Sequence, residues 1–112
     1  IYEMSENNTP GVGSTLSQVS ISSIPEAHCY LRVAGLRYDF TGLPSGASSP
    51  FDSLLAEETV LPQDLPKTKL FFHRHAIASW ATRHNIDPTT AWSIREACVE
   101  ALAAKETQVK GT

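Results

Sequence analysis

The chain is poor in cysteine and has neither a long apolar run nor clustered positive charge. Cys29 and Cys98 are the only cysteines among 112 residues. Two cysteines make no disulfide framework, so reduced thiols in a cytoplasmic protein are the simpler interpretation. No apolar run approaches the roughly 20 residues that cross a bilayer. The amino end, with Glu3 and Glu6, is not typical of a signal peptide. We therefore predict no membrane partner.

The balance of charge narrows the class of partner further. Nine Lys and Arg residues stand against twelve Asp and Glu residues, a formal net charge of −3. The basic residues form no stripe of the kind that nucleic acids require, so we predict no nucleic-acid partner. With 41% hydrophobic and 19% charged residues, the chain is typical of one globular domain with a modest core. Ile1–Met4 reads as a strand already under way, so we expect this domain, 1–112, to be a fragment of a longer protein.

The pattern along the chain predicts an α+β fold, a small antiparallel sheet packed with two carboxy-terminal helices. Residues 1–66 read as sheet and loops, with a short helix over Ser14–Ser20. A hairpin follows, formed by Ala27–Val33 and Leu36–Thr41 around a tight turn at Ala34-Gly35. After it come a loop and then a covering segment with short strand or turn pieces. The proline at position 25 is predicted to mark the edge of the first hairpin strand.

The helical part is predicted over 67–105, followed by a frayed polar tail over 106–112. Its first helix spans Lys67–His84, and its second begins at Asp87-Pro88, a capping side chain followed by a proline at the first helical position. The two apolar stripes, at three- and four-residue spacing, consist of Leu70, His73, Ile77, Trp80 and Ala81, and of Ala91, Ile94, Cys98, Ala101 and Leu102.

The candidate site is a histidine and an aspartate on the two strands of the hairpin. A hairpin of this length can place His28 beside Asp39. An aspartate that accepts a hydrogen bond from one imidazole nitrogen orients the ring, and the other nitrogen can then act as a base towards a thiol or hydroxyl. The alternative is a polar pair on the wet face of a half-buried hairpin, and spacing alone does not separate the two.

The other chemically active residues read as structural. Cys29 is adjacent to His28 and faces away from it in a strand, so we interpret it as a small buried hydrophobe. Cys98 lies on an apolar helical stripe and is assigned to the core. His73 and His75 face apart on a helix, and His84 has no neighbour at a recognisable ligand spacing, so we predict no metal site. No cofactor motif is present, because the short glycine pair at positions 11 and 13 lacks the context of a phosphate loop.

Two segments carry a family resemblance: Glu26–Val33 reads as a strand that opens with a histidine, and Arg37–Thr41 reads as a strand that closes in Asp-x-Thr. Together they resemble the transglutaminase-like superfamily. In that superfamily a cysteine at a helix amino end precedes a strand with the catalytic histidine and then one with the aspartate. The resemblance covers about the first forty residues and implies that His28 and Asp39 are the second and third members of a Cys-His-Asp triad. The interval between them is shorter than in most relatives, and the cysteine would precede Ile1.

The resemblance implies thiol-dependent acyl transfer or amide hydrolysis on a peptide or acyl substrate. His28 would be the general base and acid, and Asp39 its orienting partner; this chain alone would be inert. The missing amino-terminal half would dock on an exposed surface, which could instead drive self-association. Two alternatives stay open: a non-catalytic binding or regulatory module on the same scaffold, and a metal-binding protein that uses the histidines.

Overall fold

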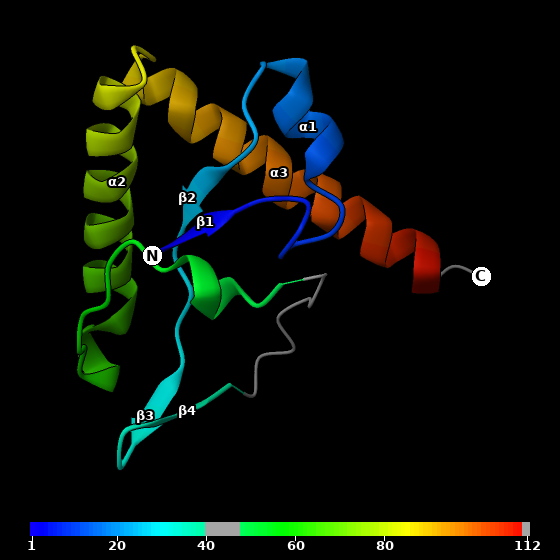
Figure 1. The fold of residues 1–112 in the computed structure, drawn as a ribbon. Coiled ribbons are helices and arrows are strands. Elements are labelled where there is room, and N and C mark those ends of the chain that lie inside the picture. The colour runs from blue at the N-terminus through cyan, green and yellow to red at the C-terminus, as the bar shows by residue number, and fades with distance from the viewer. Residues whose placement is uncertain (40–47, 111–112) are drawn as a thin grey trace.

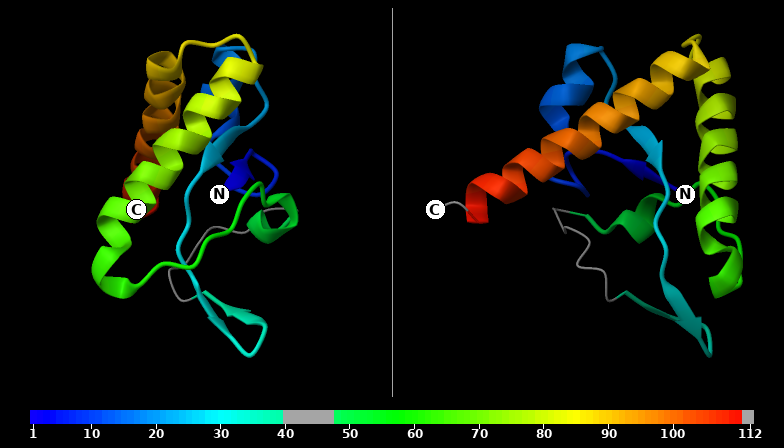
Figure 2. Two further views of the ribbon diagram at one scale, coloured as in Figure 1. Left: turned by 90° about the vertical axis from the view of Figure 1, so that its left-hand side faces the viewer. Right: turned by 180° about the vertical axis from the view of Figure 1, so that it is seen from behind.

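The computed structural model describes residues 1–39 and 48–110, the last five by their backbone alone. The predicted α+β class is confirmed, although the strands form two separate two-stranded antiparallel sheets, β1–β2 and β3–β4. Figure 1 shows the first sheet between α2 and α1, with α1 packed beside α3, while the β3–β4 hairpin projects away from this body. Figure 2 shows the same projection from two further sides.

The first sheet carries the core. β1 (Tyr2–Met4) pairs with β2 (Ile24–Glu26), with Glu3 opposite Pro25. Pro25 therefore lies within a strand and not before one, which corrects the prediction. A proline is tolerated there because each strand of a two-stranded sheet has a free edge. The buried apolar residues that pack with the sheet come from all three helices: Val12, Leu16, Ile77, Trp80, Ala81, Ala91 and Cys98.

The hairpin is shorter than predicted. β3 (Leu31–Val33) and β4 (Leu36–Tyr38) are joined by Ala34-Gly35, whose φ angles of 51° and 80° make the predicted tight turn. Residues 27–30 belong to neither sheet, so the chain leaves β2 and crosses to the hairpin without ladder partners. The end of the predicted return strand, at positions 40 and 41, lies outside the described residues, as does most of the predicted loop over Thr41–Pro50.

The helices follow the predicted periodicity with two differences. α1 spans Gly13–Gln18, α2 Leu65–Arg83 and α3 Pro88–Lys110. At the start of α3, the Thr90 backbone N–H donates to Asp87 Oδ2 over 3.1 Å, which confirms the predicted cap. The first difference is that α3 continues through 106–110, where a frayed tail was predicted. The second is that Leu70, predicted to be buried, is 49% exposed, because the first two turns of α2 extend past the β1–β2 sheet (Figure 1).

The covering segment before α2 has the predicted short pieces. It contains two 3-10 turns, η1 (Pro50–Ser53) and η2 (Pro62–Asp64), and an isolated bridge from Leu54 to Tyr2. This bridge holds the segment against the edge of β1 and directs the residues after it towards the start of α2. Among the described helices, none is long and apolar enough to cross a membrane.

Candidate functional site

The hairpin brings His28 and Asp39 into direct contact, as predicted. His28 Nε2 lies 2.7 Å from Asp39 Oδ2, and the two side chains are 14% and 18% exposed. A carboxylate only accepts hydrogen bonds, so Nε2 carries the proton of this contact and donates it. The contact crosses the base of the hairpin, because His28 precedes β3 and Asp39 follows β4 by one residue. A charge-assisted bond of this length fixes the orientation of the imidazole.

Aromatic rings surround the imidazole. The rings of His28 and Tyr30 are stacked at 6.3 Å between centroids, and Phe51 of η1 meets both edge-on, at 6.5 Å and 4.8 Å. The Arg37 guanidinium lies over the Phe51 ring at 5.1 Å. Tyr30, Phe51 and Arg37 therefore pack together beside the imidazole. Phe51 was not predicted as a site residue, since nothing in the sequence relates η1 to the hairpin.

An ion-pair group links the hairpin to the segment before α2. The carboxylate of Glu57 lies 2.6 Å from Arg32 Nη1 and 3.4 Å from Arg37 Nε. Arg32 and Arg37 are opposite each other in the β3–β4 register, so one carboxylate is shared between two cations on the same face. Both arginines are substantially exposed, and we expect the group to orient the hairpin more than to stabilise it.

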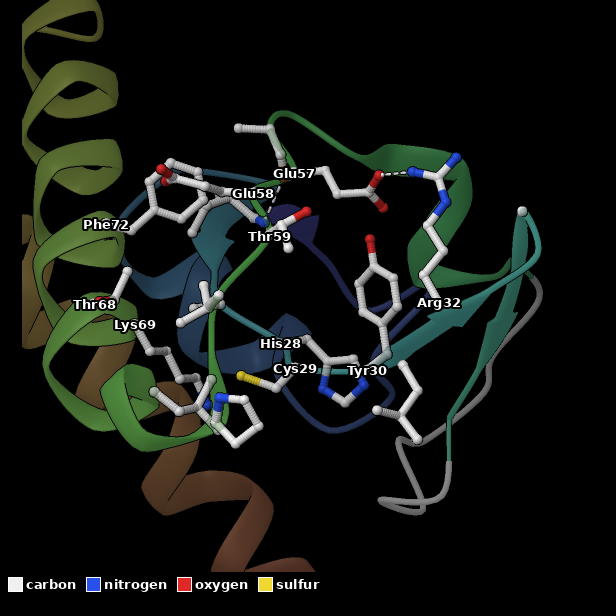
Figure 3. Close-up of a pocket in the computed structure, with 18 residues that line it drawn as sticks. His28, Cys29, Tyr30, Arg32, Glu57, Glu58, Thr59, Thr68, Lys69 and Phe72 are labelled. Carbon is white, nitrogen blue, oxygen red and sulfur yellow. Dashed lines mark hydrogen bonds and ion pairs between the residues drawn. The ribbon is translucent and has the colours of Figure 1, made fainter.

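A pocket of about 660 Å³ lies between these parts (Figure 3). Its walls come from residues 27–32, from the segment 56–60 and from the start of α2, where Thr68, Lys69 and Phe72 contribute. His28 and Cys29 both line it, which corrects the prediction that Cys29 is a buried hydrophobe: this cysteine is half-buried on a pocket wall. In Figure 3 its sulfur points to the α2 side, away from the His28 ring.

The second cysteine belongs to the core, as predicted. Cys98 is fully buried, and burial raises the pKa of its thiol to about 11, with a further increase from Glu26 and an opposing effect of Arg95. A thiol in this state is a poor nucleophile near neutral pH. Cys98 therefore plays no part in chemistry at the pocket.

The segment that leads to His28 is anchored by a buried carboxylate. Glu26 Oε1 accepts from the Ala27 backbone N–H at 2.9 Å and from Arg95 Nε at 3.1 Å, and it lies 3.3 Å from His73 Nε2. The two donors come from the residue after β2 and from α3, and His73 of α2 lies beside them. Because Glu26 is only two residues before His28, this cluster sets where the chain emerges from the body of the molecule.

The remaining histidines have structural contacts. His73, predicted to be partly buried, is fully buried and donates from Nε2 to the Pro25 carbonyl at 3.1 Å. His75 stacks on Phe71, and His84 Nδ1 lies 2.8 Å from the Trp80 carbonyl oxygen. In the part of the chain that the structure describes, no three His, Cys, Asp or Glu side chains are grouped so that they could hold a metal ion.

No protein-family profile, curated protein or solved structure matches this chain.

The functional argument therefore depends on the geometry of the site. An imidazole held by a carboxylate, enclosed by aromatic rings and placed on the wall of a pocket can accept and return a proton. The sequence identified its two central residues, His28 and Asp39. It did not identify Phe51, Glu57 or Lys69, which reach the same region only through the tertiary fold.

Proposed function

We propose that His28 and Asp39 are the general base and the orienting carboxylate of a thiol-dependent acyl transfer or amide hydrolysis, as in transglutaminase-like proteins. The observation that carries the proposal is the 2.7 Å contact between His28 Nε2 and Asp39 Oδ2 on the wall of a pocket. The packing of the Tyr30 and Phe51 rings beside the imidazole supports the proposal as well.

In this reaction His28 takes the proton of the thiol, and the thiolate attacks the carbonyl carbon of the substrate. The imidazolium, stabilised by Asp39, then gives its proton to the leaving amine and a thioester is formed. Water or an amine attacks the thioester and restores the thiol. Asp39 stays ionised throughout and orients the ring.

The nucleophilic thiol is assigned to sequence outside these 112 residues. Cys98 is buried with a raised pKa, and the Cys29 sulfur points away from the His28 ring (Figure 3). We accordingly expect the chain alone to be inert towards acyl substrates. The predicted docking of an amino-terminal half, or self-association, is supported by the exposed apolar side chains of the hairpin: Leu31, Val33, Leu36 and Tyr38.

The test uses the protein extended by its upstream coding sequence. The rate of iodoacetamide labelling of the upstream thiol is measured near pH 7 by mass spectrometry. We expect His28→Ala to lower that rate by roughly 100-fold, the lower end of what a general base contributes, and Asp39→Asn to lower it as well. His75→Ala is the matched control, since it removes an exposed histidine of α2. An unchanged labelling rate in His28→Ala would show that the triad is wrong.

A non-catalytic binding module is the second candidate, and the pocket favours it. The Tyr30 hydroxyl is buried without a hydrogen-bond partner among the described residues, a state that a bound ligand would relieve. An upstream coding sequence without a cysteine would favour this candidate over the enzyme.

A further inference from the structure

One edge of the hairpin has unpaired backbone groups. Leu31 and Val33 pair with Tyr38 and Leu36 across the two-residue turn, and among the described residues no second strand lies beside β3. Successive residues of a strand direct their N–H and C=O groups to alternate edges, so Arg32 directs its groups away from β4; Tyr30 directly precedes this strand. These groups form no backbone hydrogen bond with any residue that the structure describes. An open strand edge of this kind is a template for another strand.

The opposite wall of the pocket has unpaired backbone as well. Residues 57–60 run between the Leu54 bridge and η2 with no helix or ladder of their own. Their N–H and C=O groups, like those of Tyr30 and Arg32, are without a backbone partner in the described part of the chain. Figure 3 shows Glu58 and Thr59 on one side of the pocket and Tyr30 on the other. Two unpaired backbone stretches therefore line one cavity.

Several polar side chains of the pocket also lack a hydrogen-bond or ion-pair partner among the described residues. The buried Tyr30 hydroxyl points into the pocket in Figure 3, while its ring is held by Phe51. A buried hydroxyl without a partner is destabilising, and a hydrogen bond with a ligand would relieve it. Lys69 and Glu58, on different walls, have no ion-pair partner among the described residues.

We infer that this pocket binds an extended peptide segment, which adds as a strand to the free edge of β3. Its backbone pairs with the N–H and C=O groups of Tyr30 and Arg32, and one of its polar groups meets the Tyr30 hydroxyl. Apolar side chains on its other side pack against Phe72 and Leu65 of α2. Backbone recognition of this kind identifies a peptide in preference to other ligands.

The size and charge of the pocket agree with that class. Its volume of about 660 Å³ lies within the range of about 300–1,000 Å³ that is usual for ligand sites. One cation and one anion on its walls suit a peptide with side chains of both signs and do not favour a polyanion. The inference does not depend on the catalytic proposal, since it requires neither a thiol nor the His28–Asp39 contact.

The experiment selects a ligand and then tests the mode of binding. A displayed library of seven-residue peptides is screened on the chain, and the selected peptide is titrated into isotope-labelled protein by NMR. We expect the largest amide shifts at Tyr30, Arg32 and Thr59. N-methylation of the backbone nitrogens that pair with β3 is expected to weaken binding at least about tenfold, because each methyl group removes a donor and blocks the edge.

Tyr30→Phe tests the unpartnered hydroxyl, and Tyr38→Phe is its matched control on the other strand of the hairpin. We expect Tyr30→Phe to weaken peptide binding about threefold to tenfold and Tyr38→Phe to leave it unchanged. The inference is overturned if no peptide binds below about 1 mM, if N-methylation has no effect, or if the shifts map elsewhere. It is also overturned if a second copy of the chain, and not the peptide, protects the Tyr30 and Arg32 amides.

The Asp39→Asn variant separates this inference from the proposed function. Asp39 does not line the pocket, so the variant is expected to keep peptide affinity within about twofold while thiol labelling of the extended protein falls. Loss of labelling with retained binding supports both ideas. If peptide binding is retained and the labelling rate is unchanged, only the catalytic proposal is contradicted. If no peptide binds but labelling still depends on His28, only the peptide site is contradicted.

Discussion

At the scale of single residues, His73 is the titratable group whose surroundings most constrain its charge. Burial lowers the pKa of this histidine below 6.5, an effect that Arg95 and Lys69 reinforce and that Glu26 and the Pro25 carbonyl oppose. The neutral ring is held by its donation to Pro25, with the Trp92 ring 4.9 Å away. Folding therefore favours the unprotonated form.

The lowered pKa of His73 predicts a loss of stability on mild acidification. The unfolded chain protonates this histidine near pH 6.5 and the folded chain does not. The contribution of neutral His73 to the free energy of unfolding is therefore complete above that pH and falls as the pH decreases below it. From this one group, the free energy of unfolding changes by at most about 1.4 kcal/mol per pH unit. Urea unfolding at pH 7 and pH 5.5 measures it. We expect His73→Gln to flatten the dependence and His75→Gln to leave it as it is; equal slopes in all three proteins would contradict the assignment.

The two cysteines are predicted to differ in reactivity. Cys98 is fully buried with a pKa raised to about 11, whereas Cys29 is half-buried on the pocket wall. At pH 8 about one Cys98 thiol in a thousand is ionised, and the reagent must also reach it. We expect iodoacetamide to label Cys29 at least about tenfold faster, as measured by mass spectrometry of the cleaved peptides. Labelling in denaturant is the control, in which the two rates converge. Equal rates in the folded protein would show that Cys98 is not buried.

At the scale of elements, the hairpin depends on its turn. Ala34 has a φ of 51°, a conformation that asparagine and glycine adopt more readily than alanine. We expect Ala34→Asn to stabilise the hairpin by about 1 kcal/mol, which slows hydrogen exchange of the Leu36 amide about fivefold. Gly35→Ala is expected to accelerate that exchange, although a Cβ at Gly35 would meet no atom within 4 Å, because its φ is 80°. If neither change alters the exchange, the turn is not formed in solution.

The helices and the turn were predictable because their signals are local. Asp87 and Pro88 cap a helix through atoms within three residues, and Ala34-Gly35 closes a hairpin through backbone conformation alone. The strand ends were less predictable, because the length of a strand depends on a partner elsewhere in the chain. Leu70 illustrates the limit for helices, because its spacing fits the apolar stripe and yet it is 49% exposed.

At the scale of the whole molecule, the Glu26 cluster holds three elements together. Its carboxylate accepts from the Ala27 N–H at 2.9 Å and from Arg95 of α3 at 3.1 Å, and His73 Nε2 of α2 lies 3.3 Å from it. Removing one member of a buried ionic cluster leaves the others without a partner, at a cost of about 3 kcal/mol. We expect Glu26→Ala to reduce the free energy of unfolding by about that amount.

The matched control for Glu26 is Glu57→Ala, which removes the exposed carboxylate shared by Arg32 and Arg37. Surface pairs of this kind contribute at most about 1 kcal/mol. Urea denaturation of the two variants measures the difference. Similar losses in both would show that the Glu26 cluster contributes no more than a surface pair.

Local patterns in the amino-acid sequence predicted the α+β class, the two long helices, the hairpin turn and the contact between His28 and Asp39. Each of these depends on residues that are close in sequence or paired across one short turn. The tertiary fold decided the rest: the packing of Phe51 against the imidazole, the sharing of Glu57 by two arginines, the burial of Glu26 beside His73 and Arg95, and the pocket. Those contacts join segments separated by twenty to seventy residues, and no spacing within a strand or helix encodes them.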